Sequence, residues 1–155
     1  MNTISFFSGL NMDELGFFPL APARMPSFSK TKFKKGAVNL ILSKKKIVGE
    51  IAYIFCSDEE LIFINRKYLS HDTYTDVITF DYTEKRIISG DIFISVERVK
   101  ENAKTYNVTF KQELIRVMVH GILHLFGLKD KSLKEEKKMR KAEDDAIKKY
   151  FSEND

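Results

Sequence analysis

The chain has a single cysteine, Cys56, and no tryptophan. One thiol cannot form a disulfide within the chain, so stability must come from an apolar core, and we expect no disulfide-linked partner. No apolar run approaches the ~18 residues that a membrane-spanning helix needs. The first 17 residues lack the basic stretch followed by an apolar one that marks a secretory signal. These absences predict a cytoplasmic protein with no membrane partner.

What the chain does contain is typical of a globular domain. It has 155 residues, of which 43% are hydrophobic and 31% charged. A chain of this length buries roughly two-thirds of the surface that it exposes when unfolded. Neither a repeat nor a low-complexity linker divides it, so we expect residues 1–155 to form a single domain.

The net charge of +4 excludes no partner, but the lysines are unevenly distributed. Residues 30–46 (KTKFKKGAVNLILSKKK) carry seven lysines and no acid. Such a run can contact a phosphate backbone, or it can form a solvated surface. The charge pattern alone favours the solvated surface.

Strand-like and helix-like segments alternate along the sequence. S-x-x-E capping boxes at Ser57 and Ser132 indicate the starts of two helices. Residues 16–29 hold all three prolines, which predicts an irregular segment. The expected fold is α+β: a small mixed sheet of about four strands flanked by helices. The expected strands are 4–7, 50–56, 75–82 and 90–96, the last two paired as a ribbon, and the expected helices are 33–46, 97–106, 111–126 and those that follow the two capping serines.

The stretch VMVHGILHLFGLKDKS (117–132) carries the strongest chemical signal. His120 and His124 are four residues apart, so both project from one face of a helix. Gly127 can end that helix in a left-handed conformation and let the chain turn back. Asp130 can then reach the two imidazoles and supply a carboxylate, giving three protein ligands and an open position for water. The sequence therefore predicts a metal site on a central helix and the loop that follows it.

Two histidines at this spacing also occur by chance on buried helices that bind nothing. Burying two imidazoles among apolar residues costs free energy unless their nitrogens are satisfied, and a metal would satisfy them. Zinc peptidases place a glutamate directly after the first histidine, where this chain has Gly121, so peptidase chemistry is disfavoured. Two histidines and a carboxylate also resemble the facial triad of non-haem iron oxygenases, which leaves the identity of the metal open.

Three segments resemble motifs of the YbeY-type proteins, metal-dependent endoribonucleases of rRNA maturation. HGILHLFGLKD resembles H-G-x-L-H-x-x-G-x-D-H, INRKYLSHDTYTDVITF resembles L-N-x-x-Y-R-x-x-D-x-P-T-D-V-L-S-F, and SGDIFIS resembles L-G-D-I-x-I-S. The three occur in the family's order. The resemblance covers roughly residues 50–150, and residues 1–49 contribute little to it.

The resemblance implies a metal-dependent, single-strand-specific endoribonuclease that acts in rRNA maturation, at the 3′ end of the small-subunit rRNA, and in ribosome quality control. Its implied cofactor is one divalent ion, with zinc expected, and its implied partners are rRNA and the small ribosomal subunit. Two alternatives stay open. One is a non-catalytic ribosome-assembly factor with a structural metal, and the other is a metallohydrolase of another substrate.

The chain departs from the family pattern at the third ligand. Without a gap, the family's third histidine falls on Asp130 and its preceding aspartate on Lys129. The resemblance then implies that His120, His124 and Asp130 bind the metal and act in catalysis through a metal-bound water. A shifted alignment would instead make Asp130 the family's aspartate and Lys131 a lost ligand. The ungapped alignment is preferred because it keeps three ligands.

A second departure is Leu69, where the family has an arginine proposed to contact RNA. A leucine cannot hold phosphate, so Arg66 or His71 is the expected substitute in substrate binding. Asp76 lies in the same family block, and we expect it to orient a ligand histidine, as carboxylates next to metal sites often do.

Overall fold

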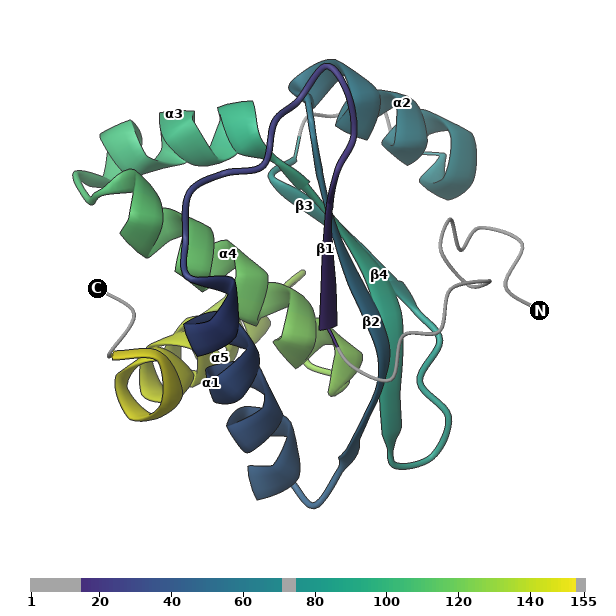
Figure 1. The fold of residues 1–155 in the computed structure, drawn as a ribbon, viewed down its shortest axis with the longest axis vertical. Helices are drawn as coiled ribbons and strands as arrows, with labels where there is room; N and C mark the ends of the chain where they lie inside the picture. The colour runs from purple at the N-terminus through teal and green to yellow at the C-terminus, as the bar shows by residue number, and fades with distance from the viewer. Residues whose placement is uncertain (1–14, 71–74, 153–155) are drawn as a thin grey trace.

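The computed structural model describes residues 15–70 and 75–152 (Figure 1). The expected strand at 4–7 and the candidate substrate residue His71 lie outside these ranges. The elements are β1 (Leu15–Pro19), α1 (Lys30–Ser43), β2 (Ile47–Cys56), α2 (Asp58–Leu69), β3 (Val77–Asp81), β4 (Ile87–Ser95), α3 (Val96–Tyr106), α4 (Phe110–Leu125), α5 (Leu133–Ala146) and a π-helical turn, η1 (Ile147–Phe151).

The four strands form one mixed sheet in the order β1-β2-β4-β3. β1, β2 and β4 run parallel, whereas β3 pairs antiparallel with β4 from Val77 opposite Ile94 to Asp81 opposite Gly90. The predicted α+β fold and the predicted ribbon are therefore confirmed. Among the strands of the described residues, β3 lies at an edge of the sheet.

Helices cover both faces of the sheet, with α1, α4 and α5 on one face and α2 on the other (Figure 1). Successive residues of β2 divide between the two cores, because side chains alternate along a strand. Ile51, Tyr53 and Phe55 face the larger helical layer. The intervening Ala52, Ile54 and Cys56 pack with α2. Burial on both faces explains why residues 51–56 of β2 are apolar throughout.

The prediction that residues 16–29 are irregular was wrong for their first part. Leu15–Pro19 form β1, which extends the sheet beside β2. Proline is tolerated at the edge of a sheet, and Pro19 is the last residue of an edge strand. The Phe17 ring stacks on Tyr53 with centroids 5.7 Å apart, so tertiary packing recruits this segment into the sheet. The chain then stays irregular until Ser29 caps α1.

The helix that carries the histidine pair, α4, packs closely on the centre of the sheet. A Cβ atom added at Gly121 would lie 2.7 Å from Cγ2 of Ile92 in β4, so a larger residue would require Ile92 or α4 to shift. The Tyr53 hydroxyl donates to the Met118 carbonyl at 2.7 Å. Gly127 has φ of +99°, the left-handed conformation predicted for the helix end. Across the described part of the chain, no helix is both long and apolar enough to cross a membrane.

Candidate metal centre

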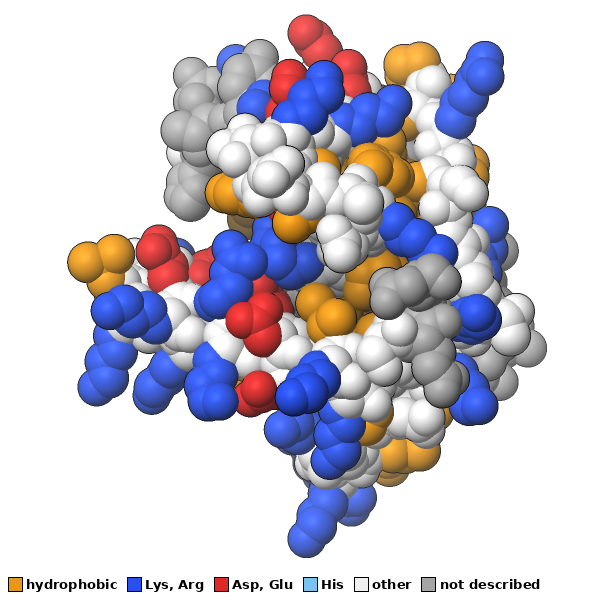
Figure 2. Space-filling view, turned by 90° about the vertical axis from the view of Figure 1, so that its left-hand side faces the viewer, with side chains coloured by type: hydrophobic (Ala, Val, Ile, Leu, Met, Phe, Trp, Pro, Cys, Tyr) orange, Lys and Arg blue, Asp and Glu red, His pale blue; other side chains and the backbone are white. Residues whose placement is uncertain are grey.

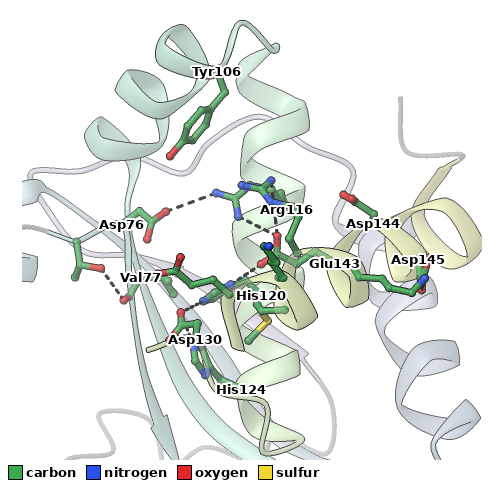
Figure 3. A pocket seen from close by; sticks show the side chains of 16 residues that line it. Asp76, Val77, Tyr106, Arg116, His120, His124, Asp130, Glu143, Asp144 and Asp145 are labelled. Atoms are coloured by element: carbon green, nitrogen blue, oxygen red, sulfur yellow. Dashed lines mark hydrogen bonds and ion pairs between the residues drawn. The ribbon is translucent and has the colours of Figure 1, made fainter. Parts of the chain in front are cut away.

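The structure brings the three predicted ligands together (Figure 3). Asp130 Oδ2 lies 3.1 Å from His120 Nε2 and 3.4 Å from His124 Nε2. One potential ligand atom from each residue lies within 4.8 Å of the other two. The histidines are one turn apart on α4, and the reversal at Gly127 returns Asp130 to them. The residues that converge are the three that the ungapped alignment selected.

The hydrogen bonds of the imidazoles leave their Nε2 atoms available. Nδ1 of His124 lies 2.9 Å from the Leu128 carbonyl oxygen, and Nδ1 of His120 lies 2.5 Å from Glu143 Oε2. A carbonyl oxygen only accepts hydrogen bonds, so Nδ1 of His124 carries the proton. The Glu143 carboxylate also accepts, so Nδ1 of His120 carries a proton as well. Each ring then points its Nε2 atom at the Asp130 carboxylate. A metal ion between these three atoms would bind all of them at once, so the group could hold a metal.

The donor set fits a divalent metal ion. Two imidazole nitrogens and one carboxylate oxygen are ligands that zinc accepts, with a further position left for water. The same set suits non-haem iron, so the structure supports a metal-binding group without selecting the ion.

Glu143 on α5 contacts a candidate ligand and is absent from the site predicted from the sequence. Its side chain is 2% exposed, and its two oxygens have different partners: Oε2 meets His120, and Oε1 accepts from Arg116 Nη1 at 3.1 Å. Burial by itself raises the pKa of Glu143, but the hydrogen bond with His120 and the charge of Arg116 outweigh it and lower the pKa. A signal was present, because Glu143 occupies the inward stripe of α5 between Met139 and Ala146.

Arg116 continues this network on α4. Its Nε donates to Glu113 Oε1 at 3.0 Å, and its Nη2 donates to Glu113 Oε2. Burial lowers the pKa of Arg116, yet the bonds with Glu113 and the charge of Glu143 raise it overall. Glu113, Arg116 and His120 follow one another at intervals of three and four residues. This polar stripe on an apolar helix was readable in the sequence.

Asp76 does not make the contact that we expected of it. The carboxylate that bonds a ligand histidine is Glu143, whereas Asp76 Oδ2 accepts from Asn102 Nδ2 at 3.1 Å and lies 3.8 Å from Arg116 Nη2. Burial raises the pKa of Asp76, although Arg116 opposes the shift. α5 brings Glu143 against His120, and Asp76 is left to partner the arginine.

Two hollows meet at the candidate metal centre. The first, of about 930 Å³, holds the three ligands together with Arg116, Asp76 and Tyr106. Basic side chains of α5 also line it: Lys137, Arg140 and Lys141. The side of the molecule that carries α3, α4 and the C-terminal helices has many Lys and Arg side chains on its lower half, with acidic ones among them (Figure 2).

The second hollow, of about 800 Å³, shares Thr75, Val77 and His124 with the first. Leu69 lines it, as do Lys129 and Lys131 from the loop that carries Asp130. The two hollows therefore adjoin at the start of β3 and at the second histidine. Arg66, predicted to bind substrate, is exposed on α2 and lines neither hollow.

Comparison with known proteins identifies the family. The family model described as Endoribonuclease YbeY matches residues 24–151. A Flavobacterium johnsoniae protein named Endoribonuclease YbeY is 58% identical over 108 residues, which cover 70% of this chain and 78% of that one. A Bacteroides fragilis protein of the same name is 47% identical over 124 residues, covering 80% of this chain and 89% of the relative.

The fold agrees with a solved structure. A Thermotoga maritima protein known from its solution structure superimposes with a TM-score of 0.57 at 27% sequence identity, covering 90% of this chain and 93% of that one. From the family match, the relatives and the fold together, the chain belongs to the Endoribonuclease YbeY family.

Proposed function

We propose that this chain is a metal-dependent endoribonuclease that cuts single-stranded RNA during rRNA maturation, at the 3′ end of the small-subunit rRNA, and in ribosome quality control. As a member of its family it is an endoribonuclease, a hydrolase that cuts RNA internally. The observation that carries the metal dependence is the approach of two Nε2 atoms to the Asp130 carboxylate. We further propose that the ion is zinc, that the small ribosomal subunit is the partner, and that the whole chain acts as one cytoplasmic domain.

The residues of the site have distinct tasks in this proposal. A bound divalent ion would polarise a phosphoryl oxygen and lower the pKa of a water molecule. Glu143 and the Leu128 carbonyl hold the rings of His120 and His124 by their Nδ1 atoms. Asp130 supplies a negative charge that would offset part of the charge of the cation. Gly121 packs against β4 and supplies no general base of the peptidase kind.

Substrate binding is proposed to use the basic side chains of both hollows. Lys137 and Lys141 of α5 line the hollow that holds the ligands, so they can contact phosphates on one side of the centre. Lys129 and Lys131 line the same hollow as Leu69, and we propose that they supply the charge that leucine lacks. Roles for Arg66 and His71 stay predictions.

The test is a metal analysis combined with RNA cleavage by the purified protein. We expect about one equivalent of a divalent ion per chain, in keeping with a single three-ligand centre. Single-stranded RNA should be cut, duplex RNA should be left intact, and a chelator should abolish cleavage. The variant His124→Ala should lose the ion because it removes one of three ligands.

The control for metal content is His71→Ala, which changes the one histidine outside the pair. A wild type that binds no ion, or that cuts RNA equally well with chelator, would contradict the proposal. Metal binding with no cleavage of any RNA would favour the assembly-factor alternative.

A further inference from the structure

Behind the candidate metal centre lie two buried carboxylates that share one cation. Glu113 and Glu143 are each 2% exposed, and a buried carboxylate is costly unless it is paired. Arg116 pairs with both, since it bonds Glu113 through Nε and Nη2 and Glu143 through Nη1. The network therefore joins α4 to α5 directly behind His120.

The arginine determines how Glu143 meets His120. Arg116 Nη1 holds Glu143 Oε1 at 3.1 Å, and this leaves Oε2 at 2.5 Å from His120 Nδ1 (Figure 3). If Oε1 were released, the carboxylate could rotate and the bond to Nδ1 would lose its geometry. The same bond directs Nε2 of His120 at Asp130.

We propose that Arg116 is a positioning residue of the metal centre: by holding Glu143, it fixes the ring of His120 in the orientation that binds the ion. This inference rests on the proposed metal dependence. Arg116 would then act on the metal site without contacting the ion, through Glu143 and His120.

A direct contact between Arg116 and RNA is the competing explanation, because the residue lines the ligand hollow. The structure disfavours it on two grounds. Only 16% of the side chain is exposed, and its Nε, Nη1 and Nη2 atoms are all engaged with Glu113 or Glu143. Asp76, 3.8 Å from Nη2, adds a third acid on the side facing β3. A guanidinium so fully occupied has little capacity left for a phosphate.

The test is a double-mutant cycle on metal affinity that uses Co²⁺ as the probe. The variants Arg116→Met, Glu143→Gln and the double variant are stripped of metal and titrated with Co²⁺, whose visible absorption reports the ligand geometry. We expect each single variant to bind Co²⁺ about 10- to 100-fold more weakly than wild type, the usual effect of losing a partner behind a ligand. Because both act through one contact, the double variant should lose no more than the worse single variant.

Folding is controlled with a second pair of variants. Arg116→Met leaves Glu113 buried and unpaired, so Glu113→Gln/Arg116→Met removes that charge and should restore the melting temperature without restoring Co²⁺ affinity. Glu113→Gln alone keeps the contact of Arg116 with Glu143, so its affinity should stay at the wild-type level.

Unchanged Co²⁺ affinity in Glu113→Gln/Arg116→Met would overturn the inference. It would also be overturned if the losses of Arg116→Met and Glu143→Gln multiplied in the double variant, because the two residues would then act independently. A wild type that binds no Co²⁺ would contradict the metal dependence itself, a separate result.

Discussion

At the scale of single residues, one backbone carbonyl decides which atom of His124 can bind a metal. The Leu128 oxygen accepts from Nδ1 at 2.9 Å, so Nε2 is the nitrogen left to bind a metal. On His120 the carboxylate of Glu143 has the same effect. We therefore expect metal binding to depend most on Asp130, because its oxygen faces both Nε2 atoms.

We predict that Asp130→Asn weakens zinc binding by at least about 100-fold. Losing a residue that only orients a ligand costs up to about 100-fold, and losing a ligand itself should cost more. The amide loses the negative charge and is a poor metal ligand. Asp130→His should retain zinc, since imidazole nitrogen is a common third ligand of open zinc sites. Competition with a chromophoric zinc chelator measures both.

The matched control is Asp144→Asn, an exposed acid in the same hollow. If Asp130→Asn and Asp144→Asn both bound zinc as tightly as wild type, Asp130 would not be a ligand. The shifted alignment, in which the third ligand is lost, would then be preferred.

At the scale of elements, α4 has two opposed faces with different requirements. One face packs on the sheet through Gly121 and the Met118 carbonyl, and the other presents Arg116, His120 and His124 to α5 and the ligand loop. The distance between α4 and the sheet therefore sets the position of the histidines. Gly121 controls that distance.

We predict that Gly121→Ala destabilises the protein by up to about 2 kcal/mol. Alanine gains about 1 kcal/mol of helix propensity, whereas overpacking a well-packed core costs about 1–3 kcal/mol. The new methyl would meet Ile92, which is fully buried. Denaturant unfolding of the metal-free protein measures the change.

A double variant identifies the cause. In Gly121→Ala/Ile92→Ala the clash is removed, so the combined destabilisation should be smaller than the sum of the two single effects. Additive effects would show that the contact between residue 121 and Ile92 has no part in the loss.

At the scale of the whole molecule, two groups of lysines have different surroundings. Those of residues 30–46 belong to α1 and the turn after it, and α1 packs on β2 and η1. None of them lines either hollow at the candidate metal centre. Lys137 and Lys141 of α5, and Lys129 and Lys131 of the ligand loop, do line these hollows. The solvated-surface interpretation of residues 30–46 thus agrees with their position.

We predict that Lys137→Gln/Lys141→Gln weakens binding of single-stranded RNA and lowers its salt dependence. The slope of log K against log salt should decrease by about 0.7 for each lost phosphate contact on a single strand. Metal-stripped protein, which should not cut the RNA, allows binding to be measured by fluorescence anisotropy at several salt concentrations.

The matched control removes the same charge from the other group. Lys35→Gln/Lys44→Gln changes two exposed lysines of α1 and its end, and RNA affinity should stay within error of wild type. Equal losses in both pairs would mean that net charge, not position, governs RNA binding.

Most of the fold and part of the site were predictable because their signals are local. The helix starts follow from capping residues such as Ser57 and Ser132, each bonded within one turn. The end of α4 follows from the conformational freedom of Gly127. β1 was missed because its three-proline neighbourhood suggests a loop, and only the packing of Phe17 on Tyr53 and the pairing with β2 make it a strand.

The sequence by itself determined the histidine pair, the helix stop and the return of Asp130, since all three depend on spacing within a dozen residues. The tertiary structure alone decided what stands behind the pair. Glu143 lies 23 residues from His120 in the chain and meets it because α5 packs on α4. The family motif made Asp76 a plausible partner of the histidine. Because α5 packs on α4, Glu143 contacts His120 instead, and Asp76 contacts Asn102 and Arg116. Contacts between distant segments depend on how helices dock, which local spacing does not encode.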